Sequence, residues 1–277
     1  MTAGGIAGLP PFAEWGPIGQ SFGAGLVSWS GTALGASLVF FTARVHQGFL
    51  DVVLGFAGGV MLAASFWSLL HPAIELSADY GPWRWLPASA GILLGIVFLH
   101  VTDQVLPRLQ LAAPAKEAKG LSSHWRRTTL LILAIALHNI PEGLALGVVF
   151  GAIGDGASPV SLAAAVGLMA GIAFHNLPEG MAVALPLRRE GLSPLRSFLY
   201  GQLSAAVEPL AAVAGAAAAL TARAVLPYAM GFAASAMLYV VVREVIPETQ
   251  LSGHPVAATL GIMLGFTLMM ALSVSLG

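Results

Sequence analysis

Two polar blocks with metal-binding residue types recur in adjacent apolar stretches of the sequence. The first is His138-Asn139-Ile140-Pro141-Glu142-Gly143, and the second is His175-Asn176-Leu177-Pro178-Glu179-Gly180. On a helix, residues three and four apart are neighbours, so each glutamate lies beside the histidine and the asparagine of its own block. Imidazole with carboxylate suits a borderline divalent ion such as zinc, and amide oxygen with carboxylate suits a harder ion. We therefore expect each glutamate to offer one oxygen toward the histidine and one toward the asparagine.

Each block contains a proline, which has no backbone N–H. Pro141 cannot donate to the carbonyl of Leu137, and Pro178 cannot donate to that of Phe174. Broken helices in corresponding positions are a sequence indicator of a transporter binding site. We therefore expect an interruption at both prolines, where the freed carbonyls are available to ions or water.

Three carboxylates lie well inside apolar segments, those of Glu142, Glu179 and Glu208. On insertion scales each costs roughly 2.5–3.5 kcal/mol near the bilayer centre, or about 8–10 kcal/mol together before compensation. No lysine or arginine in these segments is placed to neutralise them. Either the carboxylates are protonated, which suits a proton-coupled carrier, or cations share the site. Two bridging divalent ions would neutralise the cluster.

The composition is that of a polytopic membrane protein. Of the 277 residues, 57% are apolar and only 9% are charged, with a mean hydropathy of +0.84. Soluble domains average about 25% charged residues. The absence of cysteine excludes disulfides and thiolate ligands. Nothing in the distribution of basic residues suggests nucleic-acid binding.

Long apolar segments without strand-like alternation predict an all-α protein. Each segment reaches the roughly 20 residues that a membrane helix needs, and glycines four residues apart recur in most of them, which predicts close helix packing. We expect eight spans, at about residues 18–43, 51–74, 84–106, 128–150, 158–187, 195–220, 226–247 and 255–276.

The basic residues predict the orientation of these spans. Loops after the odd-numbered spans hold nine lysines and arginines, whereas loops after the even-numbered spans hold only Arg84 and Arg223. Cytoplasmic loops carry the excess of basic residues, so both termini are expected on the extracytoplasmic side. The segment Pro107–Arg127 is then a polar cytoplasmic loop within a single transmembrane domain that covers residues 1–277.

An internal echo predicts an inverted repeat. Gly55-Phe56-Ala57-Gly58-Gly59-Val60-Met61-Leu62 in the second span resembles Gly231-Phe232-Ala233-Ala234-Ser235-Ala236-Met237-Leu238 in the seventh. A proline follows each run, Pro72 in one span and Pro247 in the other. Because the two spans cross the membrane in opposite directions, the first three spans are expected to match the last three by inversion, around a central pair that carries the polar blocks.

Other polar residues near the span ends are weaker candidates. His71 is a candidate for ion uptake or a satisfied interfacial histidine, and Asp103 is a candidate ligand or an ordinary helix-end residue. Glu244 is placed to pass ions to Glu248 four residues later, or to pair with Arg243. The thioether of Met61 is either core packing or a soft ligand.

Taken with Glu208-Pro209, Met61-Leu62-Ala63-Ala64-Ser65 and Ile246-Pro247-Glu248, the two blocks resemble the ZIP (Zrt/Irt-like) divalent-metal transporters, in particular the bacterial GufA-like branch. The resemblance covers nearly the whole chain. It implies helices grouped as three, two and three, with the outer triplets related by inversion. It also implies an elevator-like motion of the first, fourth, fifth and sixth helices, a homodimer, and a place in the cell inner membrane.

The same resemblance implies a binuclear centre at mid-membrane. The first ion would be held by Met61, His138, Glu142, His175 and Glu179, and the second by Asn139, Glu142, Asn176, Glu179 and Glu208. The family moves zinc, iron, manganese or cadmium into the cytoplasm. These ions are the substrate, and no organic cofactor is expected.

The sequence departs from the family in two places, and two other functions remain open. Arg243 stands where relatives commonly carry histidine, and the Pro107–Arg127 loop has only His124 in place of a histidine-rich segment. An intramembrane metalloprotease should show His-Glu-x-x-His, which is absent because Asn139 follows His138. A proton-coupled carrier of another substrate would not need histidine and asparagine beside both carboxylates.

Overall fold

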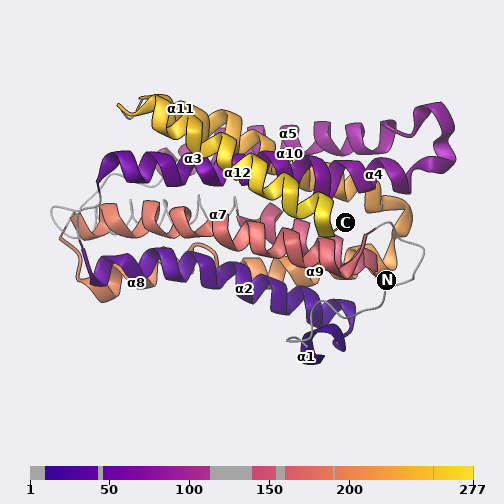
Figure 1. Ribbon diagram of the computed structural model, residues 1–277, viewed down its shortest axis with the longest axis horizontal. Helices are drawn as coiled ribbons and strands as arrows, with labels where there is room; N and C mark the ends of the chain where they lie inside the picture. Colours follow the sequence, from indigo (N-terminus) through magenta and orange to yellow (C-terminus); the bar gives the residue numbers. More distant parts are fainter. Residues whose placement is uncertain are drawn as a thin grey trace.

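The computed structural model describes residues 10–42, 46–112, 139–153, 160–189, 191–251 and 253–276, and this part of the chain is helical and contains no strand. Figure 1 shows long helices lying side by side along the longest axis. The helices are α1 (Pro10–Ala13), α2 (Pro17–Ser37), α3 (Gln47–Ala64), α4 (His71–Leu76), α5 (Leu86–Ala112), Asn139–Ala152, α7 (Leu162–Arg189), α8 (Pro194–Leu203), α9 (Glu208–Thr221), α10 (Leu226–Val240), α11 (Ile246–Leu251) and α12 (Pro255–Leu276).

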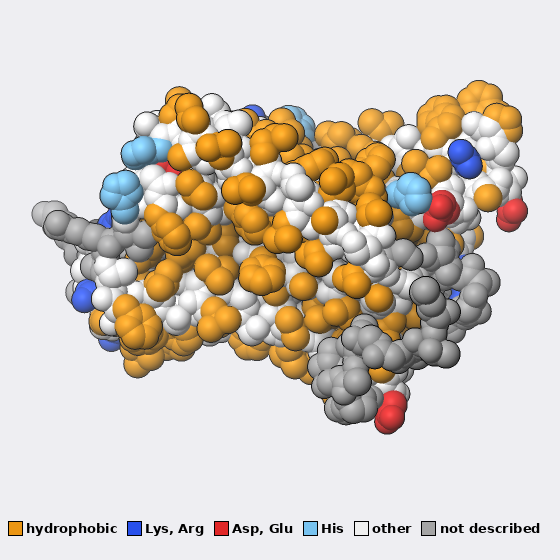
Figure 2. Space-filling view, viewed as in Figure 1, with side chains coloured by type: hydrophobic (Ala, Val, Ile, Leu, Met, Phe, Trp, Pro, Cys, Tyr) orange, Lys and Arg blue, Asp and Glu red, His pale blue; other side chains and the backbone are white. Residues whose placement is uncertain are grey.

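Five helical stretches are long and apolar enough to cross a membrane. They are Pro17–Phe40, Gln47–Leu76, Pro194–Thr221, Arg223–Leu251 and Pro255–Leu276. Figure 2 shows hydrophobic side chains over the middle of one face, with charged side chains mainly toward its two ends. An all-helical protein with this surface is a multi-pass membrane protein, as the composition predicted.

The predicted interruption of the helix at Pro178 is wrong. Helix α7 continues through Pro178 and Pro186 to Arg189. Pro141 lies in the first turn of the described helix Asn139–Ala152. Loss of one backbone hydrogen bond at a proline is therefore tolerated where neighbouring helices hold the segment.

A break is found instead within the apolar stretch Pro194–Thr221, which corresponds to the expected span at about 195–220. Residues 204–207 form turns between α8 and α9. Helix α9 then begins with Glu208 and Pro209, and a proline at a first helical position starts a helix well because its fixed φ suits that position and its missing N–H is not needed there.

Glycines allow two pairs of helices to pack backbone against backbone in the same register. A Cβ added at Gly55 of α3 would overlap the carbonyl of Ala258 in α12, and one at Gly231 of α10 would overlap that of Ala88 in α5. Further along, Gly261 and Gly265 face Val52 and Phe56, just as Gly91 and Gly95 face Tyr228 and Phe232. The prediction that these glycines serve close packing is confirmed.

Two more helix pairs pack closely and carry the polar blocks. Gly31 and Gly35 of α2 lie against the backbone of α7, and Gly180 of α7 lies against Thr32. Gly143 and Gly147 lie in the same way against Glu208 and Ala212 of α9. The small glycines bring α2 and α9 next to the helices that carry the candidate ligands.

The two spans whose sequences resemble each other, those of α3 and α10, bend in the same manner. Helix α3 passes through a π-helical turn, Ser65–Leu70, into α4, and α10 passes through a π-helical turn, Val241–Val245, into α11. In each case a proline, Pro72 or Pro247, stands second in the short helix that follows. Such π-turns inside helices are frequently found at functional sites.

Helix packing gives the first testable prediction. Gly59→Val should destabilise the protein by roughly 1–3 kcal/mol, because the new side chain would overlap the carbonyl of Ile262 and the amide of Phe266 in α12. Thermal melts in detergent measure this loss. Gly16→Ala is the matched control, since no atom lies within 4 Å of a Cβ built at Gly16. Equal melting temperatures for the two variants would contradict the close-packing argument.

Candidate metal centre

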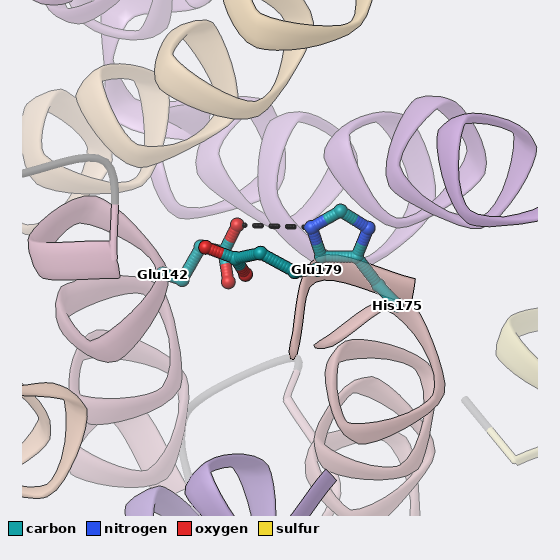
Figure 3. A group of neighbouring side chains, drawn as sticks. All are labelled: Glu142, His175 and Glu179. Carbon is teal, nitrogen blue, oxygen red and sulfur yellow. Dashed lines mark ion pairs between the residues drawn. The ribbon is translucent and has the colours of Figure 1, made fainter. Parts of the chain in front are cut away.

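Three ionisable side chains from two helices meet inside the bundle (Figure 3). Glu142 comes from the helix Asn139–Ala152, and His175 and Glu179 come from one face of α7. One ligand atom from each lies within 4.8 Å of the others. Nε2 of His175 is 3.2 Å from Oε1 of Glu142. Glu142 and His175 are 4% and 7% exposed and Glu179 is half-buried, so two of the three side chains are largely shielded from bulk solvent.

A second group of polar side chains adjoins this cluster, around Asn176. Its Nδ2 donates to Oε1 of Glu208 at 2.8 Å and to the hydroxyl of Ser28 at 2.9 Å, and it lies 3.3 Å from the Ser28 carbonyl oxygen. Asn176, Ser28 and Glu208 are fully buried. Because these neighbours accept hydrogen bonds from the amide nitrogen, they turn the amide oxygen of Asn176 elsewhere.

Asn139 is oriented in the same way from the other block. Its Nδ2 donates to the carbonyl oxygen of Ser204 at 2.9 Å. Ser204 lies in the turns between α8 and α9, where the Glu208 N–H donates to the carbonyl of Ala205 and leaves the Ser204 carbonyl for another donor. The break therefore fixes the direction of the Asn139 amide.

Several buried polar atoms of this group have no hydrogen-bond partner among the residues that the structure describes. They are Oδ1 of Asn139, Oε2 of Glu142, Nδ1 of His175, Oδ1 of Asn176 and Oε2 of Glu208. An unsatisfied buried polar group costs about 1–3 kcal/mol. Carboxylate and amide oxygens are ligands for divalent metal ions, so an ion bound at these oxygens would recover this energy for them.

The chain matches the family model described as ZIP Zinc transporter over residues 112–273. The chain belongs to the ZIP family. Zinc transporter ZIP11 of Homo sapiens is 41% identical, over 90% of this chain and 95% of the relative. Zinc transporter GufA of Myxococcus xanthus is 37% identical, over 94% of this chain and 100% of the relative. Zinc transporter ZIPB of Bordetella bronchiseptica is 37% identical, over 94% of this chain and 82% of the relative.

Family membership confirms the resemblance inferred from the two blocks. The relatives are named transporters, and this ZIP chain is a transporter rather than an enzyme such as the metalloprotease considered above.

The remaining predicted ligands of the ZIP chain are placed less directly. Met61 is buried in α3, in the same apolar cluster as Ile172, which lies one turn before His175. His138 lies outside the described residues. The side chains of Asp103 and Glu244 also lie outside the described part. The ligand roles of these residues stay predictions.

A cavity of about 570 Å³ joins the cluster to one end of the ZIP bundle. Glu142, His175 and Glu179 line its inner part. Gln47, Asp51, Arg189 and Glu248 also line it, and they lie where α3 begins, α7 ends and α11 runs, at the left of Figure 1. We call this end of the molecule the Arg189 end. Glu248, predicted as a release residue, therefore borders the same cavity as the cluster.

A separate cavity of about 380 Å³ lies toward the opposite end and is lined by His71, Glu75, Ser68 and Ser273. His71 is half exposed, with Nε2 3.8 Å from Oε1 of Glu75. The cluster residues do not line this second cavity.

Sequence reasoning missed Ser28, Ser204 and Asp51. Ser28 lies between Gly25 and Gly31, which press α2 onto α9 and α7, so a small polar residue between closely packing glycines was the available signal. Asp51 was taken as the start of a span but lies one turn inside α3 and is 2% exposed. A carboxylate inside a long apolar helix is the kind of signal that had identified the three glutamates.

The orientation of Asn176 gives a prediction about Ser28. Ser28→Ala removes one acceptor worth about 0.5–1.5 kcal/mol, so affinity for an ion held by Asn176 and Glu208 should fall roughly two- to tenfold. Ser28→Thr keeps the hydroxyl and should retain most of the affinity. Titration calorimetry with zinc measures both variants.

Ser30→Ala is the matched control for this prediction. Ser30 is exposed on the same helix, and its hydroxyl bonds only its own helix, at the carbonyl of Val27. Equal zinc affinities for Ser28→Ala and the wild type would show that Ser28 does not position Asn176.

Proposed function

We propose that this protein carries divalent transition-metal ions, zinc first among them, across a membrane through a buried binuclear site. The observation that carries the proposal is the joining of Glu142, His175 and Glu179 in a cavity that opens at one end of a ZIP-family bundle. The named activity of the relatives is zinc transport. Iron, manganese and cadmium are further candidate substrates, because histidine and carboxylate ligands accept them all.

The adjoining polar groups support two ions rather than one. His175 with Glu142 and Glu179 forms an imidazole–carboxylate set, which Met61 and His138 would complete. Asn139, Asn176 and Glu208 form an oxygen-rich set on the other side of the two shared glutamates. Two divalent ions would bring four positive charges to three carboxylates in a medium of low dielectric constant.

The cavity supports a direction of transport. At the Arg189 end, α7 closes with Arg188 and Arg189, α8 holds Arg196 in its first turn, and the π-turn before α11 holds Arg243. At the opposite end, Arg84 lies between α4 and α5 and Arg223 between α9 and α10. The excess of basic residues favours a cytoplasmic Arg189 end, so the described conformation is open to the cytoplasm. An ion at the cluster would leave past Glu248 into the cell.

We further propose eight crossings, grouped as three, two and three. The three segments beyond the five long apolar stretches are α5, the helix Asn139–Ala152 with the residues before it, and α7, whose 28 residues extend about 42 Å at 1.5 Å each. Gly55 of α3 and Gly231 of α10 contact equivalent positions of their partner helices, and so do Gly261 of α12 and Gly91 of α5. These matching contacts support the inverted repeat. The two π-helical turns support it as well.

The remaining features of the proposal follow the family resemblance. The chain forms one transmembrane domain over residues 1–277, with a cytoplasmic loop at 107–127 and both termini outside the cytoplasm. Helix α2 starts, and helix α12 ends, at the same side of the bundle, as this topology requires. The protein would reside in the cell inner membrane as a homodimer. The molar mass of the detergent-solubilised protein tests the dimer.

The proposed function predicts zinc uptake by proteoliposomes. Glu142→Ala should abolish uptake and lower the bound zinc, because this carboxylate serves both ligand sets. A zinc-sensitive dye inside the vesicles measures uptake, and elemental analysis measures bound metal. Glu14→Ala is the matched control, since Glu14 is exposed near the start of the described chain.

The same experiment separates the proposal from a proton-coupled carrier of another substrate. Near-normal zinc uptake by Glu142→Ala would exclude a shared carboxylate. Proton movement that is independent of every divalent ion offered would favour the proton-coupled carrier.

The two ligand sets should differ in their preference for metals. His175→Ala should reduce zinc affinity more than Asn176→Ala, because imidazole binds borderline ions better than an amide oxygen does. Asn176→Ala should instead weaken manganese more than zinc, because manganese prefers oxygen ligands. Calorimetric titration with both ions measures the two ratios. The reverse order for zinc would contradict the assignment of the two sets.

A further inference from the structure

We infer that His46 and His254, oriented by Asp51, form a second binding site for divalent metal ions at the Arg189 end of the molecule, beside the cavity that Asp51 lines. The inference rests on the proposed function, because such a site would receive ions that leave the central cluster. The three side chains of this second site lie outside that cluster.

Asp51 is a carboxylate buried within an apolar helix. Its side chain is 3% exposed, and the residues that follow it in α3 are apolar. Gln47 Nε2 donates to Oδ1 at 2.9 Å, and Nδ1 of His254 lies 3.1 Å from Oδ2. Asp51 also lines the cavity that holds Glu142, His175 and Glu179. A buried carboxylate is thus fixed between the cavity and a histidine.

The contact between Asp51 and His254 is the arrangement that prepares a histidine to bind metal. Metal-ligating histidines almost always donate their other ring N–H to a carboxylate, a carbonyl or water, which fixes the tautomer and raises ligand basicity. With Nδ1–H directed at Asp51, Nε2 is the nitrogen that remains for an ion. The His254 side chain is 45% exposed, so an ion can reach it.

His46 supplies a second imidazole beside His254. The ring centroids are 5.9 Å apart, and two imidazoles that share a tetrahedral zinc at about 2.0–2.1 Å have centroids about 5 Å apart. His46 is exposed, so a small rotation of its side chain closes this difference. Figure 2 shows histidine side chains together at the left end of this face, where α3 and α12 begin.

Gly48 keeps the space between the two rings open. A Cβ at this position would lie 3.3 Å from Cδ2 of His254 and 3.3 Å from Nδ1 and Cε1 of His46. In imidazole Cδ2 is bonded to Nε2, so nitrogen-bearing edges of both rings approach the same point above Gly48. Two histidines with water as further ligands hold zinc less tightly than the central cluster would, which suits release.

The test measures zinc bound by the full-length protein in detergent, by equilibrium dialysis and elemental analysis. In Glu142→Ala/Glu179→Ala protein, which lacks the central carboxylates, we expect about one zinc per chain to remain. Addition of His254→Ala or His46→Ala should remove it. Addition of His100→Ala, an exposed histidine of α5 that contacts Gln104, should leave it bound.

Asp51→Asn tests the orienting role, because it leaves both histidines in place. The affinity of the residual zinc should fall roughly 10- to 100-fold. Thermal melts of every variant verify folding, and the exposed His46 keeps the test usable if Asp51→Asn unfolds.

The outcomes distinguish this inference from the proposed function. Three outcomes would contradict the second site. They are no residual zinc in the central-site variant, zinc bound only at millimolar concentration, and residual zinc that stays bound after His46→Ala and His254→Ala. If His254→Ala removes the residual zinc of the central-site variant while the wild-type protein moves no zinc into proteoliposomes, the second site is supported and the proposed function is overturned.

Discussion

The presence of three carboxylates inside an apolar bundle, with Glu142 and Glu208 buried and Glu179 half-buried, is the constraint on which the rest of the structure depends. Glu142 contacts His175, and Glu208 accepts a hydrogen bond from Asn176, so their partners are metal-ligand types rather than lysine or arginine. A lysine would neutralise a carboxylate permanently, whereas a transported ion neutralises it only while bound. The arrangement therefore links the electrostatic energy of the site to ion occupancy.

Close helix packing is what allows so many polar groups to converge. Gly25 and Gly31 bring α2 against α9 and α7, so the hydroxyl of Ser28 can reach Asn176 across the interface. The helices that carry the centre thus pack on one another through small residues, and α3 with α12 and α5 with α10 do likewise. This division into tightly packed groups is consistent with the elevator-like motion that the family resemblance implies.

The sequence was sufficient for the all-helical, multi-pass class of fold and for the proximity of His175 to Glu179, because composition, apolar length and four-residue spacing are local properties. His175 and Glu179 share a face of α7 as their spacing required. The break at 204–207 was missed because the signals used, proline and charge, marked Pro178 instead. Whether a backbone break is tolerated depends on partners distant in sequence, here the Asn139 amide that bonds the Ser204 carbonyl.

The centre is asymmetric within an arrangement that otherwise repeats. Asn139 donates to Ser204 and Asn176 to Ser28, while Gly143 and Gly180 lie against the residue four positions after each serine. Those residues are Glu208 on one side and Thr32 on the other. Both are fully buried, but only the glutamate can carry a charge. An inverted repeat would supply two similar frames, and this one difference places a third carboxylate beside Asn176. In the proposed binuclear site, the two ion positions would therefore differ in charge as well as in ligand type, and a harder ion would be favoured nearest Glu208.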